Sequence, residues 1–249
     1  MDVHGGEKSI ILDGTTDGIF LGDQLVDLLK KDHTIEFSIY YADDKRSIFI
    51  GNYDTESHNS EYWRETGQRF RTWWDNGMIQ EKWSNQFLNP LETQTITIKL
   101  QKSTNKVEVY KNGQLMESRV DTRYGNYNYD WTKVWIGRDN VNDSTRGLNG
   151  QIYSVRIYNG LLSNDEIQKN YNIDKTRFDY LDYDNVNYVT SNLILHYDGM
   201  NNTGTGHSSS TTVWKDLSGN NKDGTLNGCT WRRRQYYIRR NNRWNIFRE

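Results

Sequence analysis

Hydrophobic and polar residues alternate along residues 149–159, and this alternation is the clearest structural signal in the chain. Tyr153, Val155 and Ile157 are separated by single polar or amphipathic residues, among them Arg156. A period of two predicts a β-strand that buries one face and turns the other to solvent. An Asn-Gly dipeptide then ends the strand.

A short helix is predicted directly after this strand. Ser163 can cap its N-terminus, and Glu166 three residues later completes the Ser-x-x-Glu pattern of a capping box. Ile167 and Tyr171 are four residues apart and would share one helical face. The pattern therefore predicts one short helix near residues 163–172.

Further strands recur at short spacing through the first two thirds of the chain. A tight hairpin is predicted at Lys111-Asn112-Gly113, and residues 47–51 are predicted to form a hairpin with residues 33–41. Short strands joined by polar turns favour an all-β antiparallel sandwich. The predicted strands cover residues 8–12, 19–21, 33–41, 47–51, 95–100, 107–110, 114–116 and 131–137.

The composition supports an all-β core made largely of aromatic rings. Mean hydropathy is only −0.95, but 13% of the residues are aromatic, and each ring buries a large area. The formal charge of −2 favours neither nucleic acid nor a membrane as partner, and the single Cys229 excludes an internal disulfide. No 18-residue apolar span occurs, so no membrane insertion is expected. Residues 1–9 also lack the apolar core of a signal peptide, so the protein either avoids that export route or begins further upstream.

Several segments in sequence order carry a family resemblance. They are SIILDGTTDGIFLG at residues 9–22, KVEVYKNGQLM at residues 106–116 and LNGQIYSVRIYNGLLSNDEIQKNY at residues 148–171. Together they resemble laminin G-like domains of the concanavalin A-like lectin/glucanase superfamily, over roughly residues 8–172. The resemblance implies a jelly-roll sandwich of two antiparallel sheets that binds carbohydrate or protein ligands, often with calcium.

The resemblance also suggests how the chain is divided. Residues 1–175 correspond to a jelly roll that lacks its opening strands, and residues 176–190 have the composition of a linker. Residues 191–230 resemble the opening strands that normally precede the DGTTDG turn. They belong either to a following module or, as we predict, fold back to complete the sandwich of residues 8–172, as a circular permutation would.

Residues 231–249 differ from the rest of the chain. They hold seven Arg, no Lys and one acid, a net charge of +6. Because the total is −2, residues 1–230 carry a net charge of −8. One interpretation is a nucleic-acid-binding tail with aromatic rings that stack on bases. We favour another interpretation. Codons for RQYYIRRNNRWNIFRE can be chosen so that the reading frame shifted by one nucleotide encodes GNIIFDGTTDGIFLG. The tail would then be the frameshifted start of another repeat in a tandem array. We expect the tail to be disordered or loosely docked.

Aromatic residues are the candidates for a glycan site, because ring faces stack on sugars. Adjacent Trp73 and Trp74 on one strand must point to opposite faces, so at most one of them lies in the core. Residues 124–130, rich in Tyr and Asn, have the composition of an adaptable binding loop. Core packing is the alternative role for most of these rings. The predicted ligand-binding residues are Trp63, Trp74, Tyr124, Tyr127, Tyr129 and Trp131.

Calcium is the candidate cofactor, because Asp and Asn oxygens in turns suit this hard cation. Asp13 and Asp17 form a weaker candidate pair, since they also suit the turn that contains them. The same turn preference is the alternative explanation for the stronger set. The predicted calcium ligands are Asp139, Asn140, Asn142 and Asp143.

These features favour a non-catalytic recognition module over an enzyme. Hydrolytic relatives carry a Glu-x-Asp-x-x-Glu cluster, because retaining hydrolysis needs two close carboxylates, and the chain lacks that pattern. We expect a glycan-binding or adhesion module of a larger repetitive surface, secreted or phage protein, located outside the cell or on a virion. A structural spacer or protein-binding domain without a sugar site is the alternative. Nucleic-acid binding through the Arg-rich tail is a weaker one.

Overall fold

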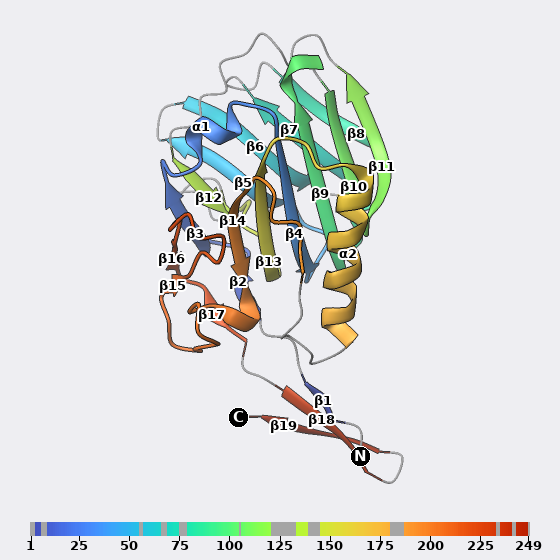
Figure 1. The fold of residues 1–249 in the computed structure, drawn as a ribbon, viewed down its shortest axis with the longest axis vertical. Helices are drawn as coiled ribbons and strands as arrows, with labels where there is room; N and C mark the ends of the chain where they lie inside the picture. Colours follow the sequence, from blue (N-terminus) through green and yellow to red (C-terminus); the bar gives the residue numbers. More distant parts are fainter. Residues whose placement is uncertain are drawn as a thin grey trace.

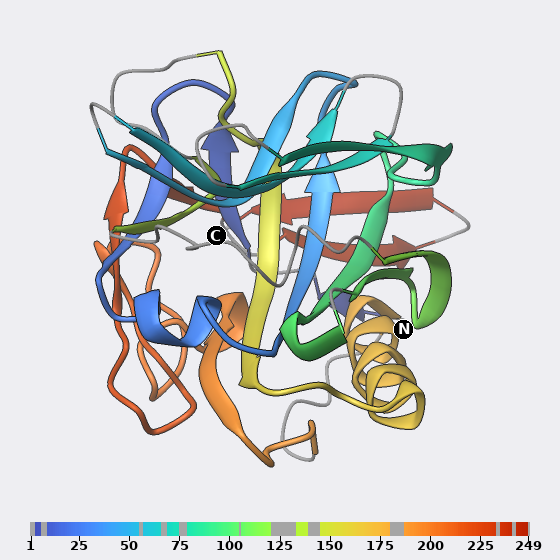
Figure 2. The same ribbon diagram turned by 90° about the horizontal axis from the view of Figure 1, so that it is seen from above.

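Two antiparallel sheets of eight strands each are stacked as a sandwich (Figures 1 and 2). The first sheet has the order β11-β10-β9-β4-β13-β2-β17, and β14 also pairs with β13. The second sheet has the order β15-β16-β3-β12-β5-β6-β7-β8. This confirms the predicted all-β sandwich. The computed structural model describes residues 3–5, 9–54, 57–65, 69–74, 79–104, 106–120, 133–138, 145–179, 187–232, 235–240 and 243–248.

The elements follow each other with short connections. The first sheet contains β2 (Ile10–Asp13), β4 (His33–Tyr41), β9 (Thr93–Gln101), β10 (Lys106–Lys111), β11 (Gln114–Val120), β13 (Asn149–Asn159), β14 (Leu193–Asp198) and β17 (Thr230–Trp231). The second contains β3 (Gly18–Gly22), β5 (Ser47–Asp54), β6 (Ser57–Glu65), β7 (Arg69–Trp74), β8 (Ile79–Gln86), β12 (Val134–Ile136), β15 (Val213–Trp214) and β16 (Gly224–Asn227). The helices are α1 (Val26–Leu29), α2 (Asn164–Asp179) and the 3-10 turns Lys102–Thr104 and Gly199–Asn201.

The apolar core lies between the two sheets and is centred on β4, β9 and β13. Val155 pairs with Phe37 across β13 and β4, and Ile35 pairs with Ile98 across β4 and β9. Each of these side chains is fully buried. The predicted hairpin at residues 111–113 is also confirmed: Lys111 pairs with Gln114, and the intervening Asn112 and Gly113 have φ of 52° and 78°, the left-handed values of a type I′ turn.

The prediction that β13 turns its polar face to solvent is wrong. Ser154, Arg156 and Tyr158 are no more than 1% exposed, like the apolar residues between them. The cause is α2, which packs on this outer face of the first sheet (Figure 1). The polar pattern of the strand is matched by polar partners on the helix and not by water.

The helix itself begins as predicted and ends later. The Ser163 backbone N–H donates to Glu166 Oε2 at 2.8 Å, and the Glu166 N–H donates to Ser163 Oγ at 3.3 Å, which is the predicted capping box. The helix continues to Asp179, so the first residues of the predicted linker 176–190 are helical. Near the other end of that segment, Tyr188 and Val189 are 5% and 7% exposed and belong to the packed body.

Residues 47–51 are a strand, but their predicted pairing with residues 33–41 is wrong. β4 is flanked by β9 and β13 in the first sheet, whereas β5 pairs with β6 and β12 in the second. Both edges of β4 are thus occupied, and the connection after Tyr41 crosses between the sheets. A short turn-rich connection can form either a hairpin or such a crossing, and the sequence alone does not distinguish the two.

Residues 193–231 supply strands to both sheets. β14 pairs with β13, β16 pairs with β3, and β17 pairs with β2. Trp214 is fully buried, stacks on Tyr197 at 5.1 Å and meets Trp231 edge-on at 5.2 Å. This is the arrangement that the fold-back hypothesis requires. The division into modules and the frameshifted repeat stay predictions.

The arginine-rich end forms strands outside the sandwich. β18 (Gln235–Arg240) and β19 (Arg243–Arg248) make a three-stranded sheet with β1 (Val3–Gly5), set apart from the two large sheets (Figure 1). These described residues are strands and not disordered, while the other expectation, a loosely docked tail, stays a prediction. Trp231, the first residue of the predicted tail, belongs instead to β17 and is 7% exposed.

Candidate functional site

A row of directly opposed residues crosses seven strands of the second sheet, and we call it the cross-sheet row. Each member pairs with the next from β16 to β8 without a break. Directly opposed residues of antiparallel strands lie on the same face of a sheet. The members of the row, in order, are Thr225, Phe20, Trp135, Gly51, Glu61, Trp73 and Gln80.

The cross-sheet row lies on the face of the second sheet that points away from the core. The flanking residues Val134 and Ile136 belong to the apolar core, so Trp135 between them takes the opposite face. The same alternation places Phe20 there, since Ile19 and Leu21 are core residues. Three consecutive apolar residues at 19–21 are the sequence signal that could have revealed Phe20, because one of them has to leave the core.

The aromatic end of the row is rigidly held. The rings of Phe20 and Trp135 are tilted at 42° with centroids 4.6 Å apart. The Arg138 guanidinium lies 5.0 Å above the Trp135 ring, a cation–π contact, and its Nη1 donates to the Thr16 carbonyl. Trp135 is consequently 8% exposed, whereas Phe20 is partly exposed. The pair, which we call the Phe20–Trp135 platform, offers a ligand mainly the partly exposed Phe20 ring beside Gly51, because Arg138 covers Trp135.

The register separates two of the predicted ligand-binding positions. Position 61 pairs with position 73, and position 60 pairs with position 74. Position 63 therefore shares the outer face with positions 61 and 73, while position 74 shares the face of Tyr62, which is fully buried in the core. Positions 63 and 74 thus lie on opposite faces of the sheet, and ligand contact by either predicted residue stays a prediction.

Several predicted residues lie outside the described part of the chain. This holds for the binding-loop candidates Tyr124, Tyr127, Tyr129 and Trp131, and for the calcium candidates Asp139, Asn140, Asn142 and Asp143. Their roles stay predictions. Among the residues that the structure describes, no group of three His, Cys, Asp or Glu side chains gathers in a way that could hold a metal ion.

Asp13 and Asp17, the weaker calcium pair, serve their own turn. Asp13 accepts hydrogen bonds from the Thr15 N–H and hydroxyl at 2.8 and 2.7 Å, and Asp17 accepts one from the Asp13 N–H at 3.0 Å. Burial raises the pKa of Asp17, which is 8% exposed. Burial also acts to raise the pKa of Asp13, but the hydrogen bonds from Thr15 outweigh it and the net pKa is lowered. Both carboxylates are engaged in closing the turn.

A second cluster of charges lies beneath α2 and is fully buried. Arg156 Nε donates to Glu36 Oε2 at 2.9 Å, and its two terminal nitrogens donate to the Asp174 carboxylate at 3.0 and 2.6 Å. Burial raises the pKa of Glu36. Burial alone would lower the pKa of Arg156, but the Asp174 and Glu36 carboxylates raise it well above its usual value. The cluster is closed to ligands and holds α2 on the sheet.

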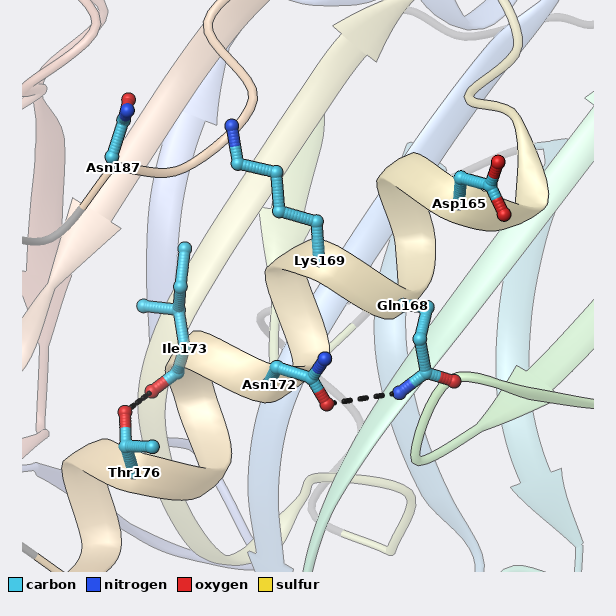
Figure 3. A pocket seen from close by; sticks show the side chains of 7 residues that line it. All are labelled: Asp165, Gln168, Lys169, Asn172, Ile173, Thr176 and Asn187. Atoms are coloured by element: carbon cyan, nitrogen blue, oxygen red, sulfur yellow. Dashed lines mark hydrogen bonds between the residues drawn. The ribbon is translucent and has the colours of Figure 1, made fainter.

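A shallow hollow of about 550 Å³ lies on the outer side of α2 (Figure 3). Most of its lining comes from one helical stripe, and Asn187 faces that stripe from the following segment. Gln168 Nε2 donates to Asn172 Oδ1 at 3.0 Å, so two of its amides satisfy each other. None of the described residues that line the hollow is aromatic, so these residues offer no stacking surface for a sugar. The lining residues are Asp165, Gln168, Lys169, Asn172, Ile173, Thr176 and Asn187.

A sandwich of two antiparallel sheets is the architecture of concanavalin A-like domains. A family model, Laminin_G_3, described as "Concanavalin A-like lectin/glucanases superfamily", matches residues 13–168. The chain belongs to this family, which confirms the predicted membership. None of the curated proteins matches the chain significantly in sequence.

Solved structures with similar folds include proteins linked to carbohydrates. A candidate carbohydrate-binding protein from Bacteroides ovatus is 14% identical with a TM-score of 0.61, and the match covers 92% of this chain and 60% of that one. The CBM40 domain of the Ruminococcus gnavus IT-sialidase, bound to α2,3 sialyllactose, is 14% identical with a TM-score of 0.54, covering 66% and 96%. A Trypanosoma rangeli sialidase is 12% identical with a TM-score of 0.53, covering 67% and 27%. At these identities the likeness concerns the fold.

Proposed function

We propose that the protein is a non-catalytic glycan-binding module whose site is the outer face of the second sheet, along the cross-sheet row. The observation that carries this proposal is the row itself. It combines the Phe20–Trp135 platform, a glycine position, an acid and a further tryptophan in one line. Aromatic faces and a few polar groups on a rigid scaffold are what a sugar site requires.

The dimensions of the row suit an extended ligand. Neighbouring strands are about 4.8 Å apart, so four spacings from Phe20 on β3 to Trp73 on β7 span roughly 19 Å. Gly51 stands at the centre of this span and carries no side chain that would fill the space between the two aromatic positions. The row would therefore seat several consecutive sugar units, with rings at both ends and Glu61 and Gln80 as hydrogen-bonding positions.

The non-catalytic character is part of the proposal. Glycoside hydrolysis of the usual kind needs two carboxyl groups that flank the scissile bond. The cross-sheet row offers one acidic position, Glu61. The family includes lectins and glucanases, so this proposal is checked by incubating the protein with any glycan that it binds. Release of reducing ends would contradict it.

A glycan array with the full chain, followed by titration calorimetry on the best ligand, tests the site. Trp73→Ala should weaken binding by about ten-fold or more, equivalent to ~1.4 kcal/mol. Lys169→Ala in the hollow on α2 is the matched control and should leave the affinity unchanged. Circular dichroism of both variants checks that they are folded. A loss with Lys169→Ala and none with Trp73→Ala would move the site to the hollow.

The array is run with calcium and again with a chelator. We propose calcium assistance through residues 139–143, and binding that survives chelation would remove calcium from the proposal. A folded sample that binds no glycan in either condition would favour the second candidate function, a spacer or protein-binding domain. A glycan-binding role also implies a location outside the cell or on a virion. The described residues contain no helix that is long and apolar enough to cross a membrane.

A further inference from the structure

Arg138 lies on the outer face of the second sheet, where the alternation of β12 would not place it. Trp135 points outward, so an unbroken strand would turn position 137 outward and Arg138 toward the core. Gly137 interrupts the strand with φ of 83°, a left-handed value that favours glycine, and a Cβ on it would contact the core residue Leu12. The turn at Gly137 therefore brings the Arg138 side chain back over Trp135.

The side chain of Arg138 lies along the sheet and does not project from it. Gly18 on β3 shares the outer face with Phe20, and a methyl group at position 18 would overlap Arg138 Cγ and Cδ. The guanidinium carbon lies 5.0 Å from the centre of the Trp135 ring, and Arg138 is only 3% exposed. The stem thus crosses β3 at Gly18, and the head covers the aromatic ring on β12.

Contacts outside the apolar core hold Arg138 in this position. Its Nη1 donates a hydrogen bond to the carbonyl of Thr16, an exposed residue in the turn before β3. The carboxylate of Asp17 interacts with the Arg138 charge, which acts to lower the pKa of Asp17, while the larger effect of burial raises that pKa. These contacts are not part of a sheet ladder, so the side chain can rotate away from Trp135 without breaking strand pairing.

A sugar and the Arg138 guanidinium compete for the same surface of Trp135. An aromatic ring has an electron-rich face on which a cation rests, and the same face is the stacking surface for a sugar. With Arg138 in place, Trp135 is 8% exposed, whereas Phe20 beside it stays partly exposed. A ligand on the cross-sheet row therefore reaches Phe20 directly, and it reaches the face of the Trp135 ring only after Arg138 has moved.

We propose that Arg138 is a movable cover on Trp135 and determines how much of the cross-sheet row a glycan can use. This inference rests on the proposed function, because it concerns the same site. The dissociation constant of a glycan that needs the Trp135 ring is the intrinsic value divided by the fraction of molecules in which the ring is uncovered. Arg138 thus disfavours glycans that must stack on Trp135, relative to glycans that bind through Phe20 and the rest of the row.

Fluorine NMR tests the cover without any glycan. The full chain is labelled with 5-fluorotryptophan, and the Trp135 resonance is identified by its absence in Trp135→Phe. Two variants should uncover the ring by different routes, because Arg138→Ala removes the cover and Gly18→Ala displaces its stem. In both variants a soluble paramagnetic agent should broaden the Trp135 resonance more strongly than in the unmodified chain. Equal broadening in all three proteins would overturn the proposal.

Titration calorimetry with a glycan selected on the array tests the consequence for binding. Arg138→Ala and Gly18→Ala should both bind about two- to five-fold more tightly, equivalent to ~0.5–1 kcal/mol, the usual size of a cation–π contact at an exposed site. The double variant R138A/W135A should lose this gain. Arg119→Ala on β11 of the first sheet is the matched control and should leave the affinity unchanged. Circular dichroism confirms that each variant is folded.

The two variants also separate uncovering of the ring from loss of the charge, because Gly18→Ala keeps the guanidinium. Weaker binding by Arg138→Ala, with unchanged binding by Gly18→Ala, would make Arg138 a glycan contact and overturn the cover. Unchanged affinities of both variants for a glycan that the unmodified chain binds would overturn the cover and leave the proposed function standing. No binding by any of these proteins on the array would contradict the proposed function and the cover with it. Binding by the two variants alone would support the cover in its strongest form.

Discussion

The side chains on the two faces of the first sheet, at its central strands β4 and β13, are equally buried, but they are apolar on one face and polar or charged on the other. On the interior face, Ile35, Phe37 and Ile157 pack against the second sheet and are fully buried. On the outer face, Glu36 and Arg156 are just as buried, beneath α2. The interior face is held by non-directional apolar contact, and the outer face by an ion pair and hydrogen bonds.

The difference shows how a polar strand face can be buried without a large cost. Burying a charge is unfavourable unless it is paired and hydrogen-bonded. Here Asn170 Nδ2 donates to Glu36 Oε2 at 2.7 Å, and Ser38 Oγ donates to Asp174 Oδ2 at 2.6 Å. Tyr188 adds its ring, 4.1 Å from the Arg156 guanidinium, and donates to Asp174 Oδ1 at 2.9 Å. The outer face is therefore specific for α2 and the segment after it, because few other covers would satisfy these groups.

The largest effect is expected when the central cation of the outer face is removed. Arg156→Met leaves the Glu36 and Asp174 carboxylates buried beside each other without a counter-charge, and should lower the free energy of unfolding by about 3–5 kcal/mol. Urea denaturation measures it. Ile157→Val on the adjacent residue and the opposite face is the control and should cost only about 1 kcal/mol. Similar losses for both variants would mean that the two faces are not held differently.

His33 is a titratable residue on the interior face, and it should make the protein sensitive to acid. Burial lowers its pKa from 6.5 to about 4, while the ring keeps hydrogen-bond contacts with the Lys31 carbonyl at 2.9 Å and the Tyr62 hydroxyl at 3.2 Å. The unfolded chain binds this proton more readily, so stability is present above pH 6.5 and is lost as the pH falls toward 4. Between pH 7 and pH 5 the loss from this group should be about 2 kcal/mol.

The variant His33→Gln isolates this contribution. Glu36 on the outer face acts with the opposite sign, because its raised pKa makes the folded state bind the proton more tightly and lowers stability as the pH rises. That contribution is common to the original chain and to His33→Gln, and it cancels when their free energies of unfolding are compared at both pH values. An equal pH dependence of the free energy of unfolding in the two proteins would show that His33 does not titrate between pH 7 and pH 5.

Alternation predicted the sandwich, because strands such as β4 and β13 alternate, but it did not predict what covers the sheets. Arg156 lies on the polar side of the predicted strand, which is expected to face solvent, since a single sequence position carries no sign of a partner 120 residues away. The capping box at Ser163 was predicted correctly, because both of its partners lie within four residues. Local signals are complete in the sequence, whereas burial depends on long-range partners.

The candidate site follows the same rule. The aromatic residues between positions 62 and 83 can be read directly from the sequence, but the cross-sheet row depends on the register between β5, β6 and β7. The bulge between Ile48 and Ile50 shifts that register. Alternation does not reveal this register. The sequence alone therefore could not show that positions 63 and 73, and not position 74, share the face of Trp135.

The smallest effect is expected at the start of α2, the cover of the polar face. Ser163→Ala removes the side-chain acceptor for the Glu166 N–H and should lower the free energy of unfolding by about 1 kcal/mol. Thr176→Ala on the exposed side of the same helix is the control, since its hydroxyl only donates to the Ile173 carbonyl inside the helix. It should change stability by less than about 0.5 kcal/mol. Urea denaturation gives both values, and amide hydrogen exchange shows whether the loss lies in α2. Because the ion pair beneath α2 anchors its middle and not its start, faster exchange should be confined to the first turn, and a uniform rise along α2 would mean that the cap and the buried charges hold the helix as one unit.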